Sequence, residues 1–160
     1  MSQPVDTKDE IHQSITVPAP PDRAFRVFTH QFGLWWPREY SIGKAEMSDF
    51  VVEPRVGGRW YEVGVDGTEC DTGRVTAYEP PGRLVLAWHL DGNWQFDPDP
   101  AHASEVEVRF TPDGDDGTRV DLFHRHFDRH GEGAAAVRAA VASTGGWGHC
   151  IAAYVRQFAS

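Results

Sequence analysis

Six segments in which apolar and polar residues alternate follow one another between Lys44 and His126, and this feature constrains the fold more than any other. Alternation with a period of two residues is the pattern of a half-buried β-strand. The connections are mostly short and rich in Gly, Pro and Asp, which is typical of hairpin turns. Strands joined in this way predict an antiparallel meander. The segments are 45–55, 57–64, 72–80, 83–90, 104–112 and 118–126.

The same alternation predicts which face of each strand is buried, because successive side chains point to opposite sides of a sheet. In segment 104–112 the charged residues Glu105, Glu107 and Arg109 share one face and are predicted to lie toward solvent. The opposite face is predicted to be the core, together with the matching face of the neighbouring segments. The inward residues are Leu84, Leu86, Trp88, Val106, Val108, Phe110, Val120, Leu122 and His124.

A strand and a helix are predicted before the meander. Segment 10–17 alternates like a strand, and Pro21 and Asp22 are good residues for the start of a helix. Apolar residues then recur at helical spacing until about Gly33, where the helix is predicted to end. Since Pro37 disfavours helical geometry at Trp36, a turn or loop is predicted from residue 34 onward.

The C-terminal forty residues return to helical spacing and predict a long helix that covers the inner face of the sheet. Its apolar stripe consists of Val137, Val141, Thr144, Gly148, Ile151, Val155 and Phe158. Three glycines surround Trp147, although each costs a helix interior about 1 kcal/mol relative to alanine. Two interpretations stay open: Gly148 faces the sheet within one helix, or Gly145 and Gly146 separate two helices, the second beginning at about Trp147.

Length and composition exclude several classes of protein. A chain of 160 residues with a formal charge of −9 and no basic stripe predicts one domain that does not bind nucleic acid. We expect a flexible segment over residues 1–9 and a single domain over residues 10–160. No apolar run approaches the ~20 residues of a membrane span, and the first ten residues lack the features of a signal peptide, so a cytoplasmic protein is predicted. Cys70 and Cys150 are expected to be reduced thiols.

Several segments, in this order, resemble the SRPBCC superfamily, also called START-like or birch-pollen-allergen-like, and within it the branch named after the activator of the heat-shock chaperone ATPase. The segments are VPAPPDRAFRVFT, LWWP, EPRVGGRWYE, GRVTAYEPPGRLVLAW, TRVDLFHRHF and GGWGHCIAAYVRQFA. The resemblance implies an α+β helix-grip fold, in which a curved antiparallel sheet wraps around a long C-terminal helix. It also implies an interior hydrophobic cavity that holds a largely apolar molecule.

The candidate ligand-binding residues follow from the aromatic composition and the predicted inner face. Tryptophan combines a large apolar body with one N–H group, which suits the wall of a pocket for a partly polar ligand. Trp35 and Trp36 are adjacent, so at most one of them is expected to face the cavity. The predicted ligand-binding residues are Trp36, Trp60, Trp88, Phe110, His124, Trp147, Ile151 and Tyr154.

The segment FHRHFDRH is the sharpest polar signal. His124 is interpreted as a polar group at the cavity wall, as a structural histidine or as a catalytic acid or base, and it is the one candidate for catalysis. A metal site formed with His126 and His130 was weighed and is not predicted, because no acidic residue completes a recognised motif. Arg55 and Glu62 either anchor a charged group or form a surface pair. No cofactor is predicted.

Three functions are weighed. The first is binding of a small hydrophobic molecule, aromatic or lipid-like, between the sheet and the C-terminal helix. The second is a cavity enzyme with cyclase-like or hydrolase-like acid–base chemistry at His124, for which Glu62, His126 or Tyr154 would supply a second polar group. The third is a module that interacts with a chaperone, as the name of the branch suggests. The sequence does not fix the oligomeric state, and a homodimer stays open.

Overall fold

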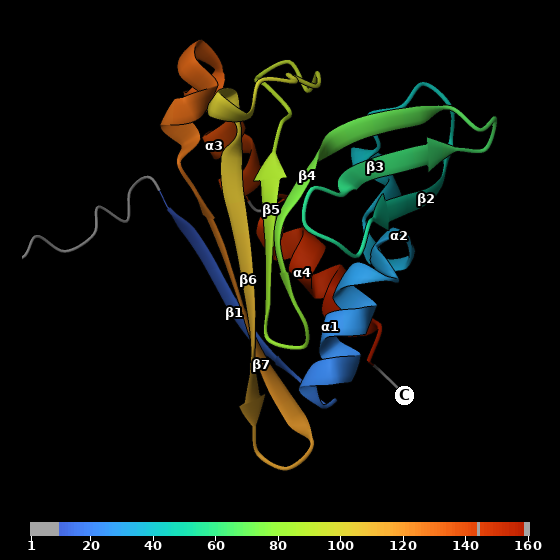
Figure 1. The fold of residues 1–160 in the computed structure, drawn as a ribbon, viewed down its shortest axis with the longest axis vertical. Helices are drawn as coiled ribbons and strands as arrows, with labels where there is room; N and C mark the ends of the chain where they lie inside the picture. The colour runs from blue at the N-terminus through green and yellow to red at the C-terminus, as the bar shows by residue number, and fades with distance from the viewer. Residues whose placement is uncertain (1–9, 144, 159–160) are drawn as a thin grey trace, which may run out of the picture.

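The computed structural model describes residues 10–143 and 145–158, which form a seven-stranded antiparallel sheet and the helices that cover its inner face (Figure 1). The strands lie in the order β1-β7-β6-β5-β4-β3-β2, so β2 to β7 form the predicted meander and β1 pairs with β7. This curved sheet around a C-terminal helix is the helix-grip fold, and the predicted α+β class is confirmed. The strands are β1 (Ile11–Val17), β2 (Met47–Val52), β3 (Arg59–Gly64), β4 (Glu69–Glu79), β5 (Arg83–Trp88), β6 (Ser104–Asp113) and β7 (Gly117–Arg125).

The inner face of the sheet has the predicted parity. Val106, Val108 and Leu122 have no exposed surface, and all nine predicted inward residues are buried. Burying a side chain of this size stabilises the fold by about 1.5–3 kcal/mol. The helices that complete the fold are α1 (Pro21–Thr29), α2 (Phe32–Trp35), η2 (Arg38–Tyr40), η3 (Pro100–His102), η4 (Phe127–Gly133), α3 (Ala134–Ala142) and α4 (Trp147–Arg156). None of the helices in the described part of the chain is long and apolar enough to span a membrane.

The first helix ends earlier than predicted. Helix α1 ends at Thr29, whereas the sequence predicts one helix that continues to about Gly33. A separate short helix, α2, begins at Phe32. Gly33 explains this arrangement, because a Cβ atom on it would lie 2.2 Å from Asp49 Oδ1 and 2.6 Å from Phe50 N. The break therefore lets α2 lie directly on β2. Trp36 is extended, with φ −63° and ψ 128°, as Pro37 predicts.

The C-terminal segment is two helices, so the prediction of one long helix is wrong and the alternative with a break is confirmed. Gly146 lies at this break, and a Cβ atom on it would lie 2.0 Å from Val141 O. Only a residue without a side chain fits there, and α4 begins at the next residue, Trp147. Gly148 is exposed and therefore does not face the core. The atom nearest to a Cβ built on it would be Gln13 Nε2, at 4.0 Å. Thr144 of the predicted stripe, like segment 1–9, lies outside the described residues.

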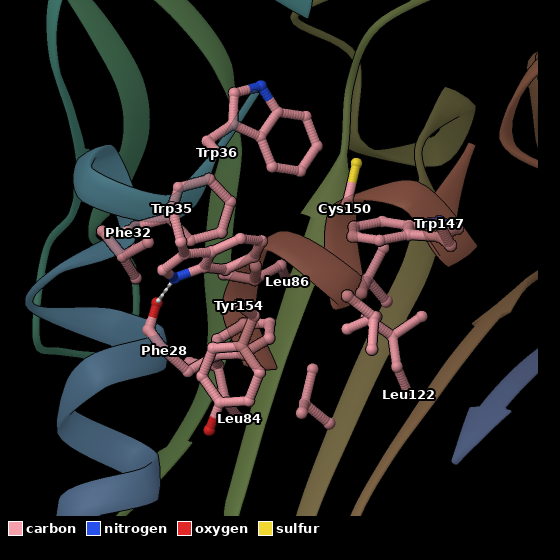
Figure 2. Close-up of a cluster of buried hydrophobic side chains, with 14 of the residues drawn as sticks. Phe28, Phe32, Trp35, Trp36, Leu84, Leu86, Leu122, Trp147, Cys150 and Tyr154 are labelled. Atoms are coloured by element: carbon pink, nitrogen blue, oxygen red, sulfur yellow. Dashed lines mark hydrogen bonds between the residues drawn. The ribbon is translucent and has the colours of Figure 1, made fainter. Parts of the chain in front are cut away.

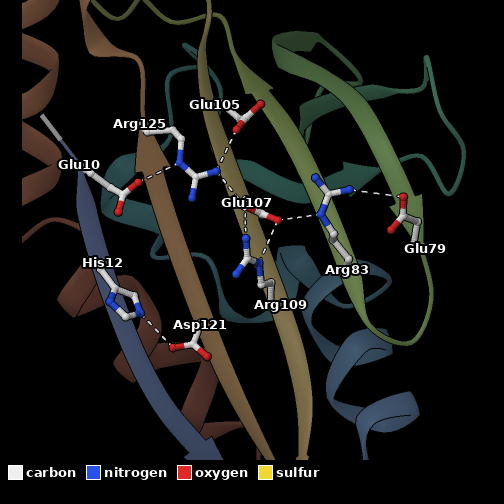
Figure 3. A network of polar contacts seen from close by, with 9 residues as sticks. All are labelled: Glu10, His12, Glu79, Arg83, Glu105, Glu107, Arg109, Asp121 and Arg125. Atoms are coloured by element: carbon white, nitrogen blue, oxygen red, sulfur yellow. Dashed lines mark hydrogen bonds and ion pairs between the residues drawn. The ribbon is translucent and has the colours of Figure 1, made fainter. Parts of the chain in front are cut away.

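The outer face of the sheet carries a network of charged side chains (Figure 3). Its centre is Glu107, which accepts hydrogen bonds from Arg83 at 2.7 Å, Arg109 at 3.0 Å and Arg125 at 2.8 Å. Only 4% of the Glu107 side chain is exposed, although the sequence predicts a solvent-facing position. Burial alone would raise the pKa of Glu107, but the three guanidinium groups outweigh it and lower this pKa to about 2. The three arginines thus stabilise the buried carboxylate in its ionised form.

Candidate functional site

A cleft of about 650 Å³ opens at one end of the sheet, between the loop before β2, the loop after β5 and the junction of α3 with α4. This volume is within the range of small-molecule sites. The cleft is mostly apolar, and its walls come from segments far apart in the sequence. The residues that line it are Trp36, Glu39, Tyr40, Ser41, Ile42, Trp88, Leu90, Asn93, Trp94, Gln95, Ala140, Val141, Ser143, Gly145, Gly146, Trp147 and Cys150.

Three buried tryptophans form the inner wall of the cleft. The ring of Trp147 lies edge to face with Trp36, at a centroid distance of 5.8 Å, and with Trp88, at 6.0 Å. Edge-to-face pairs at such distances are favourable and resist reorientation. Each of these residues is positioned by a local feature: Trp36 by Pro37, Trp88 by the end of β5, and Trp147 by the break at Gly146. The result is a rigid aromatic wall.

A fourth tryptophan, Trp94, lies at the mouth of the cleft. It belongs to the loop between β5 and β6, is 41% exposed and contacts Trp88 edge to face at 6.4 Å. Its backbone has a φ of 61°, a conformation that is unfavourable for a bulky residue. Asn93 and Gln95, on either side of it, also line the cleft. This loop thus adds one aromatic ring and two amide side chains to an otherwise apolar site.

Indole N–H groups supply unused hydrogen-bond donors in the cleft wall. Nε1 of Trp36 and Nε1 of Trp88 are buried and have no partner among residues 10–143 and 145–158. Trp60 Nε1, deeper in the core, is also buried and has no partner among these residues. Figure 2 shows the contrast between neighbours: Trp35 directs its N–H to Phe28 O, whereas the nitrogen of Trp36 points away from that cluster. A buried donor without a partner costs about 1–3 kcal/mol.

The polar side of the cleft is formed by residues that follow Trp36. Tyr40 donates a hydrogen bond from its hydroxyl to Gly145 O, which ties the loop before β2 to the junction before α4. Burial, and the nearby Cys150 and Glu39, raise the pKa of Tyr40, so its hydroxyl stays protonated at neutral pH. Cys150 is also in this wall, and burial raises the pKa of its thiol to about 12. Neither group is ionised as a nucleophile here.

Glu62 is a buried carboxylate that anchors this loop. It accepts hydrogen bonds from Ile42 N at 2.8 Å, Gly43 N at 3.1 Å and Ser41 Oγ at 2.5 Å. Arg55 lies elsewhere, exposed and 3.2 Å from Glu53, so the surface pair with Glu62 weighed from the sequence is wrong. Through its three hydrogen bonds Glu62 positions Ser41 and Ile42 in the cleft wall.

His124 lies behind the cleft wall and does not line it. It has no exposed surface, and Trp147 Nε1 donates a hydrogen bond of 2.9 Å to its Nδ1. Its Nε2 is 2.8 Å from Ser104 Oγ. Burial, and to a smaller extent the charge of His130, lower the pKa of His124 well below its usual value, so the ring is neutral. In this conformation both nitrogens are engaged within the protein.

The structure separates the predicted ligand-binding residues into two groups. Trp36, Trp88 and Trp147 line the cleft. The others are buried and do not line it: Trp60, Phe110, His124, Ile151 and Tyr154. Tyr154, for example, donates its hydroxyl to Ala24 O at 2.8 Å and so joins α4 to α1. Contact of these five residues with a ligand stays a prediction.

The histidine cluster is dispersed. Strand β7 ends at Arg125, and His126 has a φ of 67°, so it does not continue the face of His124. His130 instead contacts Ser104 Oγ at 2.7 Å. Within the described residues, no three His, Cys, Asp or Glu side chains are grouped so as to hold a metal ion.

Sequence reasoning missed the cleft residues contributed by loops. Tyr40 and Trp94 are the main examples, joined by Asn93 and Gln95, and Cys150 of helix α4 was missed as well. Periodicity assigns faces only to strands and helices, so it is silent about loops. A usable signal was nevertheless present, since a tryptophan in the thirteen-residue polar loop 91–103 has no core to fill.

Comparison with known proteins agrees with this fold. The family model of Activator of Hsp90 ATPase homolog 1-like protein matches residues 18–156. None of the curated proteins compared matches the chain significantly. The anthrahydroquino-γ-pyrone synthase Txn09, solved in complex with SUM, is similar at 40% identity, with a TM-score of 0.65 over 92% of this chain and 95% of that one.

Two further solved structures are similar. The self-sacrificing resistance protein CalC from Micromonospora echinospora is 34% identical, with a TM-score of 0.66 over 96% of each chain. Protein NE0264 from Nitrosomonas europaea is 18% identical, with a TM-score of 0.66 over 98% of this chain and 97% of that one, and it shows the fold alone. The chain therefore belongs to the family of Activator of Hsp90 ATPase homolog 1-like proteins, within the SRPBCC superfamily.

Proposed function

We propose that this protein binds a planar, polycyclic aromatic molecule that carries a hydrogen-bond acceptor, such as a quinone or pyrone carbonyl. The observation that carries the proposal is the wall formed by Trp36, Trp88 and Trp147 in a cleft of about 650 Å³. Flat aromatic rings match such a wall in shape, and their burial removes apolar surface from water. The similarity to a synthase of an anthrahydroquino-γ-pyrone supports the same ligand class.

The acceptor follows from the donors in the wall. The N–H groups of Trp36 and Trp88 lack partners among the described residues, and a carbonyl oxygen on the ligand would supply one. The hydrocarbon chain of a fatty acid would fill the volume, but it would offer these donors an acceptor only at its carboxylate end. The site therefore favours an oxygenated aromatic molecule over a lipid.

A second candidate is catalysis on such a molecule, which the 40% identity to a synthase favours. His124 would have to leave both of its hydrogen bonds to reach a substrate, so the structure does not favour it as a direct acid or base. The cleft could instead promote ring closure by holding a flexible precursor in a folded shape and excluding water. A chaperone partner, which the family description suggests, stays a prediction.

The test is a titration of tryptophan fluorescence with three probes. They are 1,8-dihydroxyanthraquinone, anthracene, which has the same ring system without acceptors, and palmitate. We expect saturable one-to-one quenching by the anthraquinone, weaker binding of anthracene and none of palmitate. Absence of saturable binding of the anthraquinone, or tighter binding of palmitate, would overturn the proposal. Incubation of the protein with a linear precursor of the anthraquinone class, followed by mass spectrometry, tests the second candidate.

A further inference from the structure

We propose that His124 is a positioning residue, which acts by holding the indole ring of Trp147 in the wall of the cleft. It does so as one link in a chain of four side chains, Trp147, His124, Ser104 and His130. The inference rests on the proposed function only for its effect on ligand affinity. The chain itself consists of contacts within the protein.

The four side chains come from four elements and are joined by short hydrogen bonds. The distances are 2.9 Å between Trp147 Nε1 and His124 Nδ1, 2.8 Å between His124 Nε2 and Ser104 Oγ, and 2.7 Å between Ser104 Oγ and His130 Nε2. Trp147 begins α4, Ser104 begins β6, His124 lies near the end of β7, and His130 lies in η4. The chain therefore ties the cleft wall to the sheet and to the turn that follows it.

The direction of both hydrogen bonds of His124 is fixed by the first one. An indole nitrogen is only a donor, so Nδ1 of His124 must accept and carries no proton. The proton of the neutral ring is then on Nε2, which donates to Ser104 Oγ. Ser104 Oγ is also bonded to Nε2 of His130, and because a hydroxyl oxygen has two lone pairs this bond can run in either direction. No alternative tautomer of neutral His124 preserves the bond to Trp147.

Burial makes this arrangement persistent. Ser104 and His124 are 1% and 0% exposed, and the ring of His124 is enclosed by those of Trp88, Phe127 and Trp147. His130 is the titratable group that acts on His124, and burial lowers the pKa of His130 as well. Rotation of Trp147 out of the wall would leave a buried nitrogen of His124 without a partner, at a cost of about 1–3 kcal/mol. The chain thus fixes one wall of the cleft in place before a ligand arrives.

A matched pair of variants tests this role. Asparagine and leucine have the same shape, and Oδ1 of an asparagine occupies about the position of Nδ1 in histidine. We expect His124→Asn to keep the affinity for 1,8-dihydroxyanthraquinone within about 3-fold, and His124→Leu to lower it about 10-fold. If His124 only fills space, His124→Leu would bind at least as well as His124→Asn, and that result would overturn the proposal.

Nuclear magnetic resonance tests the chain without a ligand. We expect His124 to show an unprotonated Nδ1 and a protonated Nε2, and to stay so at a pH where an ordinary histidine is charged. The indole N–H of Trp147 should exchange slowly with water in the wild type and in His124→Asn, and quickly in His124→Leu. A protonated Nδ1 or a rapidly exchanging Trp147 N–H would overturn the proposal. If the chain is observed but the anthraquinone does not bind, the proposed function alone fails.

Discussion

The indole rings of Trp36 and Trp147 meet edge to face in the cleft wall, with centroids 5.8 Å apart and planes inclined by 71°. Trp36 lies just after α2 and Trp147 begins α4, so the fold brings the two ends of the domain together at this point. The cleft therefore exists only when the domain is complete. Its aromatic wall is held by packing, and the N–H groups of Trp36 and Trp88 have no partner among the described residues.

Replacement of Trp36 by phenylalanine tests recognition through the indole N–H. The variant Trp36→Phe keeps an aromatic ring in the wall but removes a donor that has no partner among the described residues. We expect the affinity for 1,8-dihydroxyanthraquinone to fall about 5-fold, which corresponds to one hydrogen bond, and the affinity for anthracene to change little. Trp35→Phe is the matched control, because Trp35 bonds to Phe28 O within the core. Equal losses for both probes would count against an acceptor on the ligand.

The two glycines that flank Trp147 are predicted to respond in opposite ways to alanine. In Gly146→Ala the new Cβ atom would lie 2.0 Å from Val141 O, a backbone atom, so we expect a loss of several kcal/mol or failure to fold. In Gly148→Ala the new atom would lie on an exposed helical face, 4.0 Å from its nearest neighbour Gln13 Nε2, so we expect a gain of about 0.5 kcal/mol. Thermal unfolding of the two variants measures both effects. Similar stabilities would contradict the break between α3 and α4.

The buried carboxylate of Glu62 is predicted to support both stability and the cleft. In Glu62→Gln the side chain keeps its shape, but an NH₂ group replaces one of its two oxygens and faces the N–H of either Ile42 or Gly43, which bond to different oxygens. We expect a loss of about 2 kcal/mol in the free energy of unfolding and weaker binding of the anthraquinone. Glu46→Gln, at an exposed position nearby, should change neither. Chemical denaturation measures the free energy of unfolding of both variants. If Glu62→Gln is as stable as the wild type and binds the anthraquinone equally well, Glu62 does not anchor the loop.

The contribution of Glu107 to the free energy of unfolding is predicted to be lost at acidic pH. Because the pKa of Glu107 is lowered from 4.5 to about 2 in the folded protein, folding favours its ionised form. This contribution is complete above about pH 4.5 and disappears as the pH falls toward 2. We therefore expect Glu107→Gln to be less stable than the wild type by about 2 kcal/mol near neutral pH, and the difference to vanish at about pH 2. Glu79→Gln, at the exposed edge of the network, should cost less than about 0.5 kcal/mol. A difference that does not depend on pH would contradict the assignment.

Local patterns in the sequence predict most of the sheet and its buried face. The strands were predictable because alternation is a property of each segment alone, and Val106 and Leu122 are buried as it requires. The burial of Glu107 was not predictable, because it depends on three arginines from three strands. The end of α1 was misplaced for a similar reason, since the close contact of Gly33 with β2 is a tertiary one.

The candidate site was predictable only in part. Parity correctly placed Trp88 on the inner face, but it does not say at which level along the strands a cleft opens. Trp88 lies at the end of β5 and reaches the cleft, whereas Trp60 lies deeper. The bond between Trp147 and His124 depends on the break before α4, and spacing alone does not reveal it.

The most direct test of the central claim is the set of tryptophan indole N–H signals in nuclear magnetic resonance spectra, recorded as 1,8-dihydroxyanthraquinone is added. We expect the signals of Trp36, Trp88 and Trp147 to shift most and to saturate together. The signal of Trp35, whose N–H is bonded to Phe28 O, should shift least. Saturable binding that leaves the three cleft tryptophans unshifted, or no binding at all, would contradict it.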